Sequence, residues 1–575
     1  MVSLKNEMGN AVLALSLPAV GGEAERERVG RVRVRPEGAP ATDEWDPRER
    51  KALLALTAAA FTFRFALLLL PRVMRWDEPV YLLLGRNLWS GLGFSFSGHP
   101  ELHHSPLFPL LAGATLKLTD RPEAASDIWY VLLGALLTLP VYGLARLLTG
   151  HRGALLAAAL VAFFPALTTA VLYWGTMIEP LFLVLLYTAA FAVAKGLDRE
   201  SPWLFASAGT LTGLAFLARP EGILWMASFE GAALLVWALR GRLRQRRTLV
   251  ALAVLPVVFL VVASPQLLFL RRHTGQWMIS GKVGITYEIG RAVETADPVL
   301  YDELVNTLDA DGEIRAASES RYQRGEAGTA TVRPGDAAGR FLRNLGHVAK
   351  SSLTSEIFSA LLLLPTAWWL LVACWLLRGP WSRRRFEAEI LLAATVAPVA
   401  AFLAFHVQQR FFAPAFPGLL IWTAAGLQDL FRRLPAVRFR LATAAAGGLA
   451  LAGYFIWADV AIARHGIATS DFGHEEAGLW LEAHSAPDAK IMTQDTAISV
   501  YAGRGYVFSP RAPLDRFLDY GRRHGATYVV VDEAEITVVR PFLKPLLDSP
   551  PPGLTLLWTA RDDHAGRTLV FGARP

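Results

Sequence analysis

The sequence predicts an α-helical protein that crosses a membrane many times and ends in a small α/β domain. Of its 575 residues, 53% are hydrophobic, and they include 17 Trp and 31 Phe, a composition that indicates lipid as the main solvent. Apolar runs of about 20 residues, the length that crosses roughly 30 Å of hydrocarbon, recur through most of the chain. Short arginine-rich loops separate several of these runs.

The apolar runs define about eleven candidate transmembrane helices. They cover residues 51–70, 128–147, 153–170, 177–195, 203–218, 222–239, 248–270, 356–377, 388–407, 416–431 and 441–463. We find no repeat of fixed period and no pair of matching interrupted spans, which an inverted-repeat transporter would show.

The net charge of +7 does not predict a nucleic-acid partner. The basic residues lie in short loops between apolar runs, a distribution that is typical of membrane topology signals. The loops 240–248, 378–387 and 432–440 contain five, four and four arginines. All three fall on the cytoplasmic side if the N-terminus is cytoplasmic. The single cysteine, Cys374, excludes an intrachain disulfide and a cysteine-based metal site.

The N-terminal 1–50 segment is expected to be disordered and cytoplasmic, because residues 21–50 are rich in Arg, Glu, Pro and Gly and poor in aromatic residues. The apolar stretch AVLALSLPAV within the first 20 residues has the length of a signal-peptide core. Cleavage after it would leave an arginine-rich segment outside the cell, which disfavours that alternative.

The transmembrane domain is predicted to span residues 51–463, in a cytoplasmic membrane. With the N-terminus inside, the loops 71–127 and 271–355 and the tail 464–575 lie on the outer face. In the tail, EEAGLWLEAHSA and PLDRFLDYGRRHG have helical periodicity, whereas AKIMTQD and ATYVVVDEA have the composition of strands. This alternation predicts a small extracytoplasmic α/β domain.

Asp77 and Glu78 stand where the chain leaves the first span. A charge beside hydrocarbon costs free energy, so it indicates a functional role. An acidic pair can supply a general base or hold a cation. Adjacent residues of one helix face different directions, so we expect one of the two to enter a site. The structural alternative is that Asp77 caps a short interfacial helix carrying Tyr81, Leu84 and Leu88.

Three histidines, His99, His103 and His104, follow in the same loop. Near two carboxylates they are able to bind a divalent metal, although their spacing matches no closed zinc pattern. Hydrogen bonding to a ligand and simple placement at the interface are the alternatives. The need for a metal or any other cofactor stays open.

The sequence LARPEG places Arg219 and Glu221 at the outer end of the fifth span, and Glu179 begins the fourth. A guanidinium group grips phosphate or carboxylate in a bidentate manner, but a lone arginine also anchors a helix at the interface. Arg219 and Glu179 can equally form a buried pair.

Two further cations lie on the same side. Arg410 stands between the ninth and tenth spans, where Pro414 and Pro417 interrupt the helix, and Lys282 lies in the second outer loop. Arg410 shares the membrane depth of Asp77 and Arg219, whereas a solvated side chain is the default for Lys282.

These motifs resemble the polyprenyl-phosphate-sugar-dependent glycosyltransferases of the C-type fold, which include the protein O-mannosyltransferase and lipid A aminoarabinose transferase groups. The resemblance rests on Asp77-Glu78 with an aromatic residue just beyond, the SPLFPLL stretch, ARPEG, the acidic start of the fourth span, RFFAPAFPGLL and the WLEAHSAPDAKI tail. It covers residues 51–535. Where the family often has two prolines before leucine, this chain has Ser105 and Pro106.

The resemblance implies an inverting transfer of a sugar from a polyprenyl-phosphate carrier to a glycan, lipid or protein acceptor. Asp77 would be the base that deprotonates the acceptor hydroxyl, with Glu78 supporting it or a metal. Arg219 and Arg410 would be candidates for binding the donor phosphate or its neighbourhood. By their position on the outer side, Glu179, His103, His104, Lys282 and Tyr81 complete the candidate substrate site. The alternatives are a transporter or lipid flippase, or a ligase or polymerase that uses a diphosphate-linked oligosaccharide.

Overall fold

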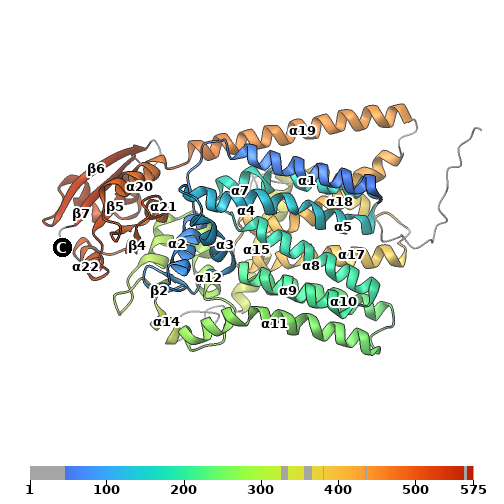
Figure 1. Cartoon of the computed structure of the whole chain (residues 1–575), viewed down its shortest axis with the longest axis horizontal. Helices are drawn as coiled ribbons and strands as arrows, with labels where there is room; N and C mark the ends of the chain where they lie inside the picture. Colours follow the sequence, from blue (N-terminus) through green and yellow to red (C-terminus); the bar gives the residue numbers. More distant parts are fainter. Residues whose placement is uncertain are drawn as a thin grey trace, which may run out of the picture. The chain divides into compact units, whose positions relative to one another are not determined.

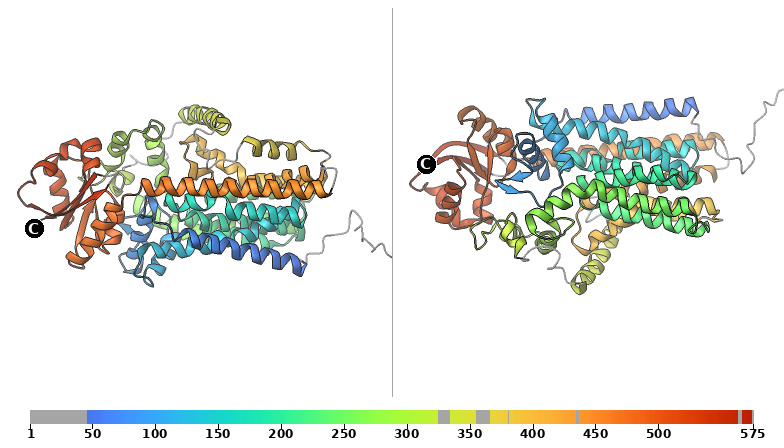
Figure 2. Two further views of the ribbon diagram at one scale, coloured as in Figure 1. Left: turned by 90° about the horizontal axis from the view of Figure 1, so that it is seen from above. Right: turned by 60° about the horizontal axis from the view of Figure 1, so that its bottom comes forward.

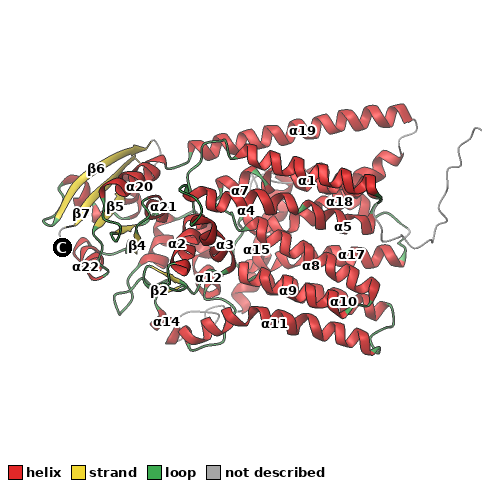
Figure 3. Ribbon diagram, viewed as in Figure 1, coloured by secondary structure: helices red, strands yellow, loops and turns green. Residues whose placement is uncertain are grey.

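The computed structural model describes residues 46–324, 334–354, 366–379, 381–433, 437–562 and 566–573. Most of the N-terminal segment 1–50 therefore lies outside the described residues. In the described residues, helices predominate up to Ala468, and every strand except the short pair β1 (Ser95–Phe96) and β2 (His99–Pro100) follows it (Figures 1 and 3). The class expected from the sequence, a helical membrane protein with a C-terminal α/β domain, is confirmed.

The helices of the apolar bundle follow the predicted spans closely. Their bounds are α1 Pro47–Leu67, α4 Pro122–Leu136, α5 Thr138–Leu148, α6 His151–Phe163, α7 Thr169–Tyr173, α8 Glu179–Arg199, α9 Pro202–Ala218, α10 Gly222–Leu239, α11 Arg246–Thr274, α16 Thr366–Leu376, α17 Arg383–Val396, α18 Phe416–Arg433 and α19 Val437–Ala468.

Seven helical stretches in the described part are long and apolar enough to cross a membrane. The expected count of eleven is not confirmed. Three further apolar helices, α3 (Leu107–Leu116), α6 and α9, have only 10–17 residues. Helix α1 carries Lys51 and Arg64 within its apolar sequence. Part of the predicted span 356–377 lies outside the described residues. The sequence pattern predicted the positions of the helices correctly, but several helices are shorter than a full membrane span.

Burial separates the centre of the bundle from its rim. The apolar windows of α8 and of the stretch containing α18 are 78% and 83% buried, whereas those of α11 and α19 are 28% and 22% buried. The helices α8 and α18 therefore form the interior, and α11 and α19 turn much of their apolar surface outward, as lipid-facing helices do.

The arginine-rich loops lie at the same end of the bundle, here called the arginine end (Figure 1). Arg240 of the loop after α10 donates two hydrogen bonds to Glu387 of α17, at 3.0 and 2.7 Å. Arg383 donates to the carbonyl oxygen of Leu239 at 2.7 Å. These contacts join two loops that the sequence placed on the same side of the membrane.

Short elements cover the opposite end, called the domain end. They are α2 Asp77–Trp89, the strands β1 Ser95–Phe96 and β2 His99–Pro100, α3 Leu107–Leu116, α12 Lys282–Glu294, α13 Pro298–Asn306 and α14 Glu319–Gln323; α15 Pro334–Thr354 and the short helices η3 Ala397–Ala404 and η4 Gln409–Ala415 follow later in the chain. The helices α2 and α3 pack against each other.

The C-terminal domain contains a five-stranded sheet in the order β4-β3-β5-β7-β6. The strands β3 Lys490–Thr493, β4 Gly505–Phe508 and β5 Tyr528–Asp532 are parallel, and the hairpin β6 Leu554–Asp562 with β7 Gly566–Ala573 joins antiparallel to β5. Helices α20 Phe472–His484, α21 Thr496–Tyr501 and α22 Leu514–Arg523 accompany it. The two predicted helices and two predicted strands of the tail are confirmed; β4, β6 and β7 were not predicted.

The C-terminal domain lies against the domain end in both views of Figure 2. The backbone NH of Met74 donates to the Tyr501 hydroxyl at 3.1 Å. The fully buried Arg540 binds both carboxylate oxygens of Asp302 in α13, at 3.0 and 2.6 Å. Charge-assisted contacts of this kind, made in a buried setting, fix the domain relative to the segments beneath it.

Candidate active site

The side chains of Asp77 and Glu78 point in different directions at the start of α2. Glu78 is fully buried and accepts two hydrogen bonds from Arg72, at 2.7 and 3.0 Å, and one from Ser126. Arg72 also binds Asp127 at 2.6 Å. Glu78 thus holds the chain before α2 against α4, and its neighbour Asp77 faces the other way. The helix has no side-chain cap, so the capping alternative for Asp77 is not observed.

Two residues with positive φ angles, Trp76 and Gly175, constrain the backbone before α2. Trp76, directly before α2, has a φ angle of 55°, a left-handed conformation that costs free energy in a residue with a side chain. Gly175, with φ of 58°, lies so close to Arg75 that an added Cβ would collide with its carbonyl oxygen. The turn before α8 and the chain before α2 therefore fix each other.

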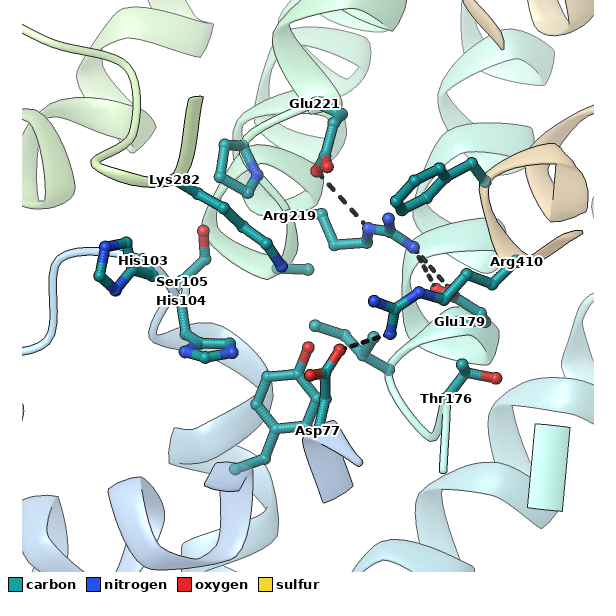
Figure 4. Close-up of a pocket in the computed structure, with 15 residues that line it drawn as sticks. Asp77, His103, His104, Ser105, Thr176, Glu179, Arg219, Glu221, Lys282 and Arg410 are labelled. Carbon is teal, nitrogen blue, oxygen red and sulfur yellow. Dashed lines mark hydrogen bonds and ion pairs between the residues drawn. The ribbon is translucent and has the colours of Figure 1, made fainter. Parts of the chain in front are cut away.

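Asp77 lines an open cavity at the domain end, with about 450 Å³ of empty space when its opening to solvent is included. Eight of the nine residues expected at the site line it, all except Glu78. They come from six separate segments of the chain, and Figure 4 shows their side chains converging. The lining residues are Asp77, Tyr81, His103, His104, Ser105, Thr176, Ile178, Glu179, Ala218, Arg219, Pro220, Glu221, Lys282, Arg410 and Phe411.

Asp77 forms an ion pair with Arg410. The guanidinium Nη1 lies 2.7 Å from the carboxylate Oδ2, and each side chain keeps about a quarter of its surface exposed. Burial by itself would raise the pKa of Asp77. The charges of Arg410, Lys282 and His104 outweigh that effect and hold the pKa well below its usual value, so the carboxylate is ionised at neutral pH.

Arg219 lies between two carboxylates on the other side of the cavity. Its Nη1 is 2.6 and 2.7 Å from the two oxygens of Glu179, and its Nε is 3.5 Å from Glu221. The guanidinium also covers the ring of Phe182 at 5.4 Å, a cation–π contact. The Arg219–Glu179 pair that the sequence suggested is present, and both partners still face the cavity.

Lys282, the first residue of α12, points into the cavity (Figure 4). Among the described residues, no carboxylate lies within ion-pair distance of its ammonium group. Arg219, Lys282 and Arg410 balance Asp77, Glu179 and Glu221 in formal charge, but the two arginines take up all three carboxylates. Of the three basic side chains among the described residues that line the cavity, Lys282 is therefore the one that remains available to an anionic ligand.

Glu101 organises the loop of residues 101–104, here called the histidine loop. Its Oε1 accepts hydrogen bonds from the backbone NH groups of His103 and His104, at 2.6 and 2.9 Å, and lies 3.2 Å from His104 Nδ1. Burial opposes ionisation of Glu101, but His104 and His103 together with the backbone hydrogen bond lower its pKa to about 2. Glu101 is thus a carboxylate that shapes the loop, and the sequence did not single it out.

His103 is oriented by Tyr322. The Tyr322 hydroxyl donates to the carbonyl oxygen of Gly281 at 2.8 Å, so its oxygen accepts from His103 Nε2 at 2.7 Å. Burial lowers the pKa of His103 to about 4 despite the charge of Glu101. His103 is therefore neutral at physiological pH and contributes no fixed positive charge to the cavity.

Tyr81 forms the floor beside Asp77. Its ring makes edge contacts with His104 and Phe108, with centroids 5.5 and 5.3 Å apart. Burial and the charge of Asp77 raise the pKa of its hydroxyl well above the usual value. Tyr81 stays a neutral phenol, which is able to donate a hydrogen bond to a ligand.

Glu221 and Thr176 also line the cavity, although neither was included in the expected site. Glu221 was visible in LARPEG, but nothing in the pattern showed that it shares Arg219 with Glu179. Thr176 and Tyr322 carry no local signal, because their roles depend on segments that meet only in the fold.

The histidines that were considered for metal binding separate into two groups. His103 and His104 share one carboxylate, Glu101, and the cavity carboxylates Asp77, Glu179 and Glu221 are close to cations. Within the described ranges, the group of ligating atoms that lie close enough to share one ion consists of His99, Glu313 and His524. That group lies outside the cavity.

The site has the parts needed to act on an anionic substrate. Fixed cations stabilise negative charge that develops on a leaving group, and an ionised carboxylate can take a proton from an attacking hydroxyl.

Comparisons with known proteins found one family model that matches part of the chain and several solved structures of similar fold. Residues 103–269 match the family model described as dolichyl-phosphate-mannose-protein mannosyltransferase. This segment contains His103, His104, Glu179 and Arg219, and ends before Lys282 and Arg410.

The fold is similar to that of two membrane glycosyltransferases. The structure of ArnT from Cupriavidus metallidurans in the apo state has a TM-score of 0.54 at 14% identity, covering 91% of this chain and 98% of that one. The same protein bound to undecaprenyl phosphate gives 0.53. The oligosaccharyltransferase of Archaeoglobus fulgidus in complex with Zn and sulfate gives 0.51 at 16% identity, covering 89% and 72%. The C-type fold suggested by the sequence is confirmed.

A short match of a different kind is to one component of an ion-translocating oxidoreductase complex from Psychromonas ingrahamii, 32% identical over 107 residues. It covers 18% of this chain and 30% of that protein. The match includes too little of either chain to indicate a shared activity.

Proposed function

We propose that this chain, a membrane protein with the C-type glycosyltransferase fold, transfers a sugar from a polyprenyl-phosphate carrier to an acceptor hydroxyl with inversion at the anomeric carbon. The observation that carries the proposal is the convergence of Asp77, Arg219, Lys282 and Arg410 on one cavity. The family match and the relative that was solved with undecaprenyl phosphate support the class of donor.

The donor would enter with its polyprenyl tail in the lipid and its phosphate at the end of the bundle. Lys282, which has no carboxylate partner among the described residues, would receive the phosphate, with the guanidinium groups of Arg410 and Arg219 nearby. As the bond between the anomeric carbon and the phosphate oxygen breaks, these charges would stabilise the phosphate that leaves.

Asp77 would act as the general base. Its ionised carboxylate would accept the proton of the acceptor hydroxyl while the hydroxyl oxygen attacks the anomeric carbon from the side opposite the leaving phosphate. General-base assistance of this kind contributes roughly 10²- to 10⁴-fold to a rate. The ion pair with Arg410 orients the carboxylate, at the cost of a lower intrinsic basicity.

The reaction would take place on the outer face of a cytoplasmic membrane. The support is the separation of the two ends of the bundle: Arg240 and Arg383 lie at the arginine end, and positive charge in short loops favours the cytoplasm. The cavity and the C-terminal domain then face outward. In this orientation the first 50 residues are cytoplasmic, as the sequence suggested.

The decisive experiment is replacement of Asp77 by Asn in the full chain. Purified protein is placed in vesicles with a panel of polyprenyl-phosphate sugars, and released carrier and glycosylated product are measured by mass spectrometry. We expect the wild type to release polyprenyl monophosphate and Asp77→Asn to lose transfer while remaining folded. Asp488→Asn, an exposed carboxylate of the C-terminal domain, serves as the control.

Other outcomes have clear meanings. Full activity of Asp77→Asn would remove Asp77 from the mechanism. Release of a carrier diphosphate would identify an oligosaccharide ligase or polymerase. Movement of substrate across the vesicle without a glycosylated product would identify a transporter. Comparison of surface glycans in cells with and without the protein would then identify the sugar and the acceptor.

A further inference from the structure

A cluster of three ligating side chains lies away from the active-site cavity. It joins His99 of β2, Glu313 of the segment between α13 and α14, and His524 at the end of α22, and is called the three-segment cluster. The Glu313 Oε2 lies 3.2 Å from His99 Nε2 and 3.3 Å from His524 Nε2. All three ligand atoms lie within 4.8 Å of one another.

His99 is held by a tight hairpin. Ser97 and Gly98, the central residues between β1 and β2, have φ angles of 51° and 85°, as the type I′ turn requires. The Ser97 hydroxyl oxygen accepts a hydrogen bond from the backbone NH of Phe508 in β4 at 3.1 Å. The hairpin is thereby attached to the C-terminal sheet, and His99 has a fixed position.

Glu313 is held by an equally ordered turn. The Asp309 carboxylate accepts hydrogen bonds from the backbone NH groups of Asp311 and Glu313, both at 2.9 Å. The next residue, Ile314, is fully buried in the hydrophobic core of the C-terminal domain. Glu313 therefore projects from a segment whose backbone is anchored on both sides.

His524 follows the last turn of α22. Its backbone NH bonds to the Tyr520 carbonyl at 3.1 Å, its own carbonyl accepts from Lys490 Nζ at 3.1 Å, and its ring packs on the Tyr520 ring with centroids 4.1 Å apart. These contacts fix the position of the imidazole at the end of the helix.

The geometry fits a shared cation better than a hydrogen-bonded group. His99 Nε2, Glu313 Oε2 and His524 Nε2 are all buried, and none has a hydrogen-bond partner in the described part of the chain. Buried polar atoms normally find a partner. Around tetrahedral zinc with bonds of about 2.1 Å, ligand atoms lie about 3.4 Å apart, close to the 3.2 and 3.3 Å separations found.

We propose that the three-segment cluster binds a divalent transition-metal ion of the Zn²⁺ type through His99 Nε2, His524 Nε2 and Glu313 Oε2. Two imidazoles and one carboxylate form a donor set that zinc prefers, and three protein ligands leave a fourth position for water. Arg523 approaches the other oxygen of Glu313, Oε1, at 3.8 Å, which leaves Oε2 directed at the histidines.

The bound ion would join three parts of the sequence. The hairpin belongs to the segment after α1, Glu313 to the segment after α11, and His524 to the C-terminal domain. The same first segment carries His103 and His104 into the active-site cavity, so the ion would hold the domain in register with the floor of the site. This role does not depend on the proposed sugar transfer.

The test uses the full chain in detergent, stripped of metal with a chelator and then incubated with Zn²⁺ alone. We expect about one Zn²⁺ per chain by elemental analysis, a higher unfolding temperature in Zn²⁺, and a tetrahedral Co²⁺ absorption spectrum when Co²⁺ replaces it. Glu313→Gln keeps the shape of the side chain, and His99→Ala and His524→Ala remove single ligands. All three variants should lose the bound ion and the thermal shift.

Two controls keep the result specific. His484→Ala removes an exposed histidine of the C-terminal domain that stacks on Trp480, and Asp77→Asn removes a carboxylate of the cavity; both should retain the ion. If a histidine variant fails to fold, Glu313→Gln decides, because its metal-free unfolding temperature is expected to match that of the wild type. Absence of stoichiometric Zn²⁺ in the wild type, or unchanged binding in Glu313→Gln, would overturn the proposal.

Discussion

Asp77 and Arg410, which are 333 positions apart in the sequence, meet in an ion pair of 2.7 Å at the mouth of the helical bundle. Asp77 begins α2, whereas Arg410 lies in η4, just before α18. The pair joins the candidate base to a candidate phosphate-binding cation. Its consequences for activity can be measured.

The first prediction concerns pH. The Asp77 carboxylate must be ionised to act as a base, and Arg410 is the largest influence that lowers its pKa. The acidic limb of the kcat/KM profile should therefore lie below the ordinary aspartate range of about 4. In Arg410→Gln burial is less opposed, so the pKa rises and the limb should move to higher pH. Arg516→Gln, an exposed arginine of α22, should leave it in place.

The second prediction concerns Lys282. A charge-assisted hydrogen bond to the donor phosphate contributes about 1.5–3 kcal/mol, so Lys282→Gln should weaken donor binding roughly 10- to 100-fold. The measurement is KM for the polyprenyl-phosphate sugar in vesicles. Lys117→Gln removes a lysine that binds the Trp89 carbonyl outside the cavity, and should change KM little. An unaltered donor KM in Lys282→Gln would exclude Lys282 from phosphate recognition.

The third prediction separates the adjacent carboxylates. Glu78→Gln removes the charge that pairs with the buried Arg72, and breaking a buried pair costs about 3 kcal/mol. Its unfolding temperature should fall, whereas that of Asp77→Asn should change little because Asp77 is partly exposed. Thermal unfolding in detergent measures both. Equal stability of the two variants would contradict the division of roles at the start of α2.

The fourth prediction concerns Gly175. Alanine there would adopt a strained φ angle and collide with the Arg75 carbonyl oxygen, at a cost of about 1–3 kcal/mol from the strain alone. Both the unfolding temperature and transfer activity should fall. Gly231→Ala is the matched control: its helix α10 leaves open space for a Cβ, and alanine there should stabilise by about 0.5–1 kcal/mol. Similar unfolding temperatures would rule out the close approach.

The candidate site was predictable where polar residues stand against lipid. Asp77, Arg219 and Arg410 interrupt apolar sequence at the ends of spans. A charged side chain beside lipid costs free energy and is rare, so its presence indicates a functional site. Lys282 and the histidines lie in polar loops, where a charged side chain is ordinary. Lys282, His103 and His104 were candidates because of their place in the outer loops, and only the packing of α12 and of the loop around Glu101 places these three side chains in the cavity.

The acidic pair and the histidines show where local pattern fails. The sequence joined Glu78 to Asp77, but the helix start turns their side chains apart. It grouped His99 with His103 and His104, yet His99 faces Glu313 and His524, which lie more than 200 and 400 positions further along the chain. Such partners leave no periodicity that a reader of the sequence can detect.

The sequence by itself determined that the chain is a bundle of apolar helices with an α/β tail, because burial in lipid and secondary-structure periodicity are written in consecutive residues. It also determined which loops carry the arginines. Tertiary structure alone decided that Arg410 pairs with Asp77, that Glu101 and Tyr322 orient the histidine loop, and that Lys282 keeps no carboxylate partner among the described residues. The physical reason is that side-chain charges interact over a few ångströms in space, and the fold sets those distances.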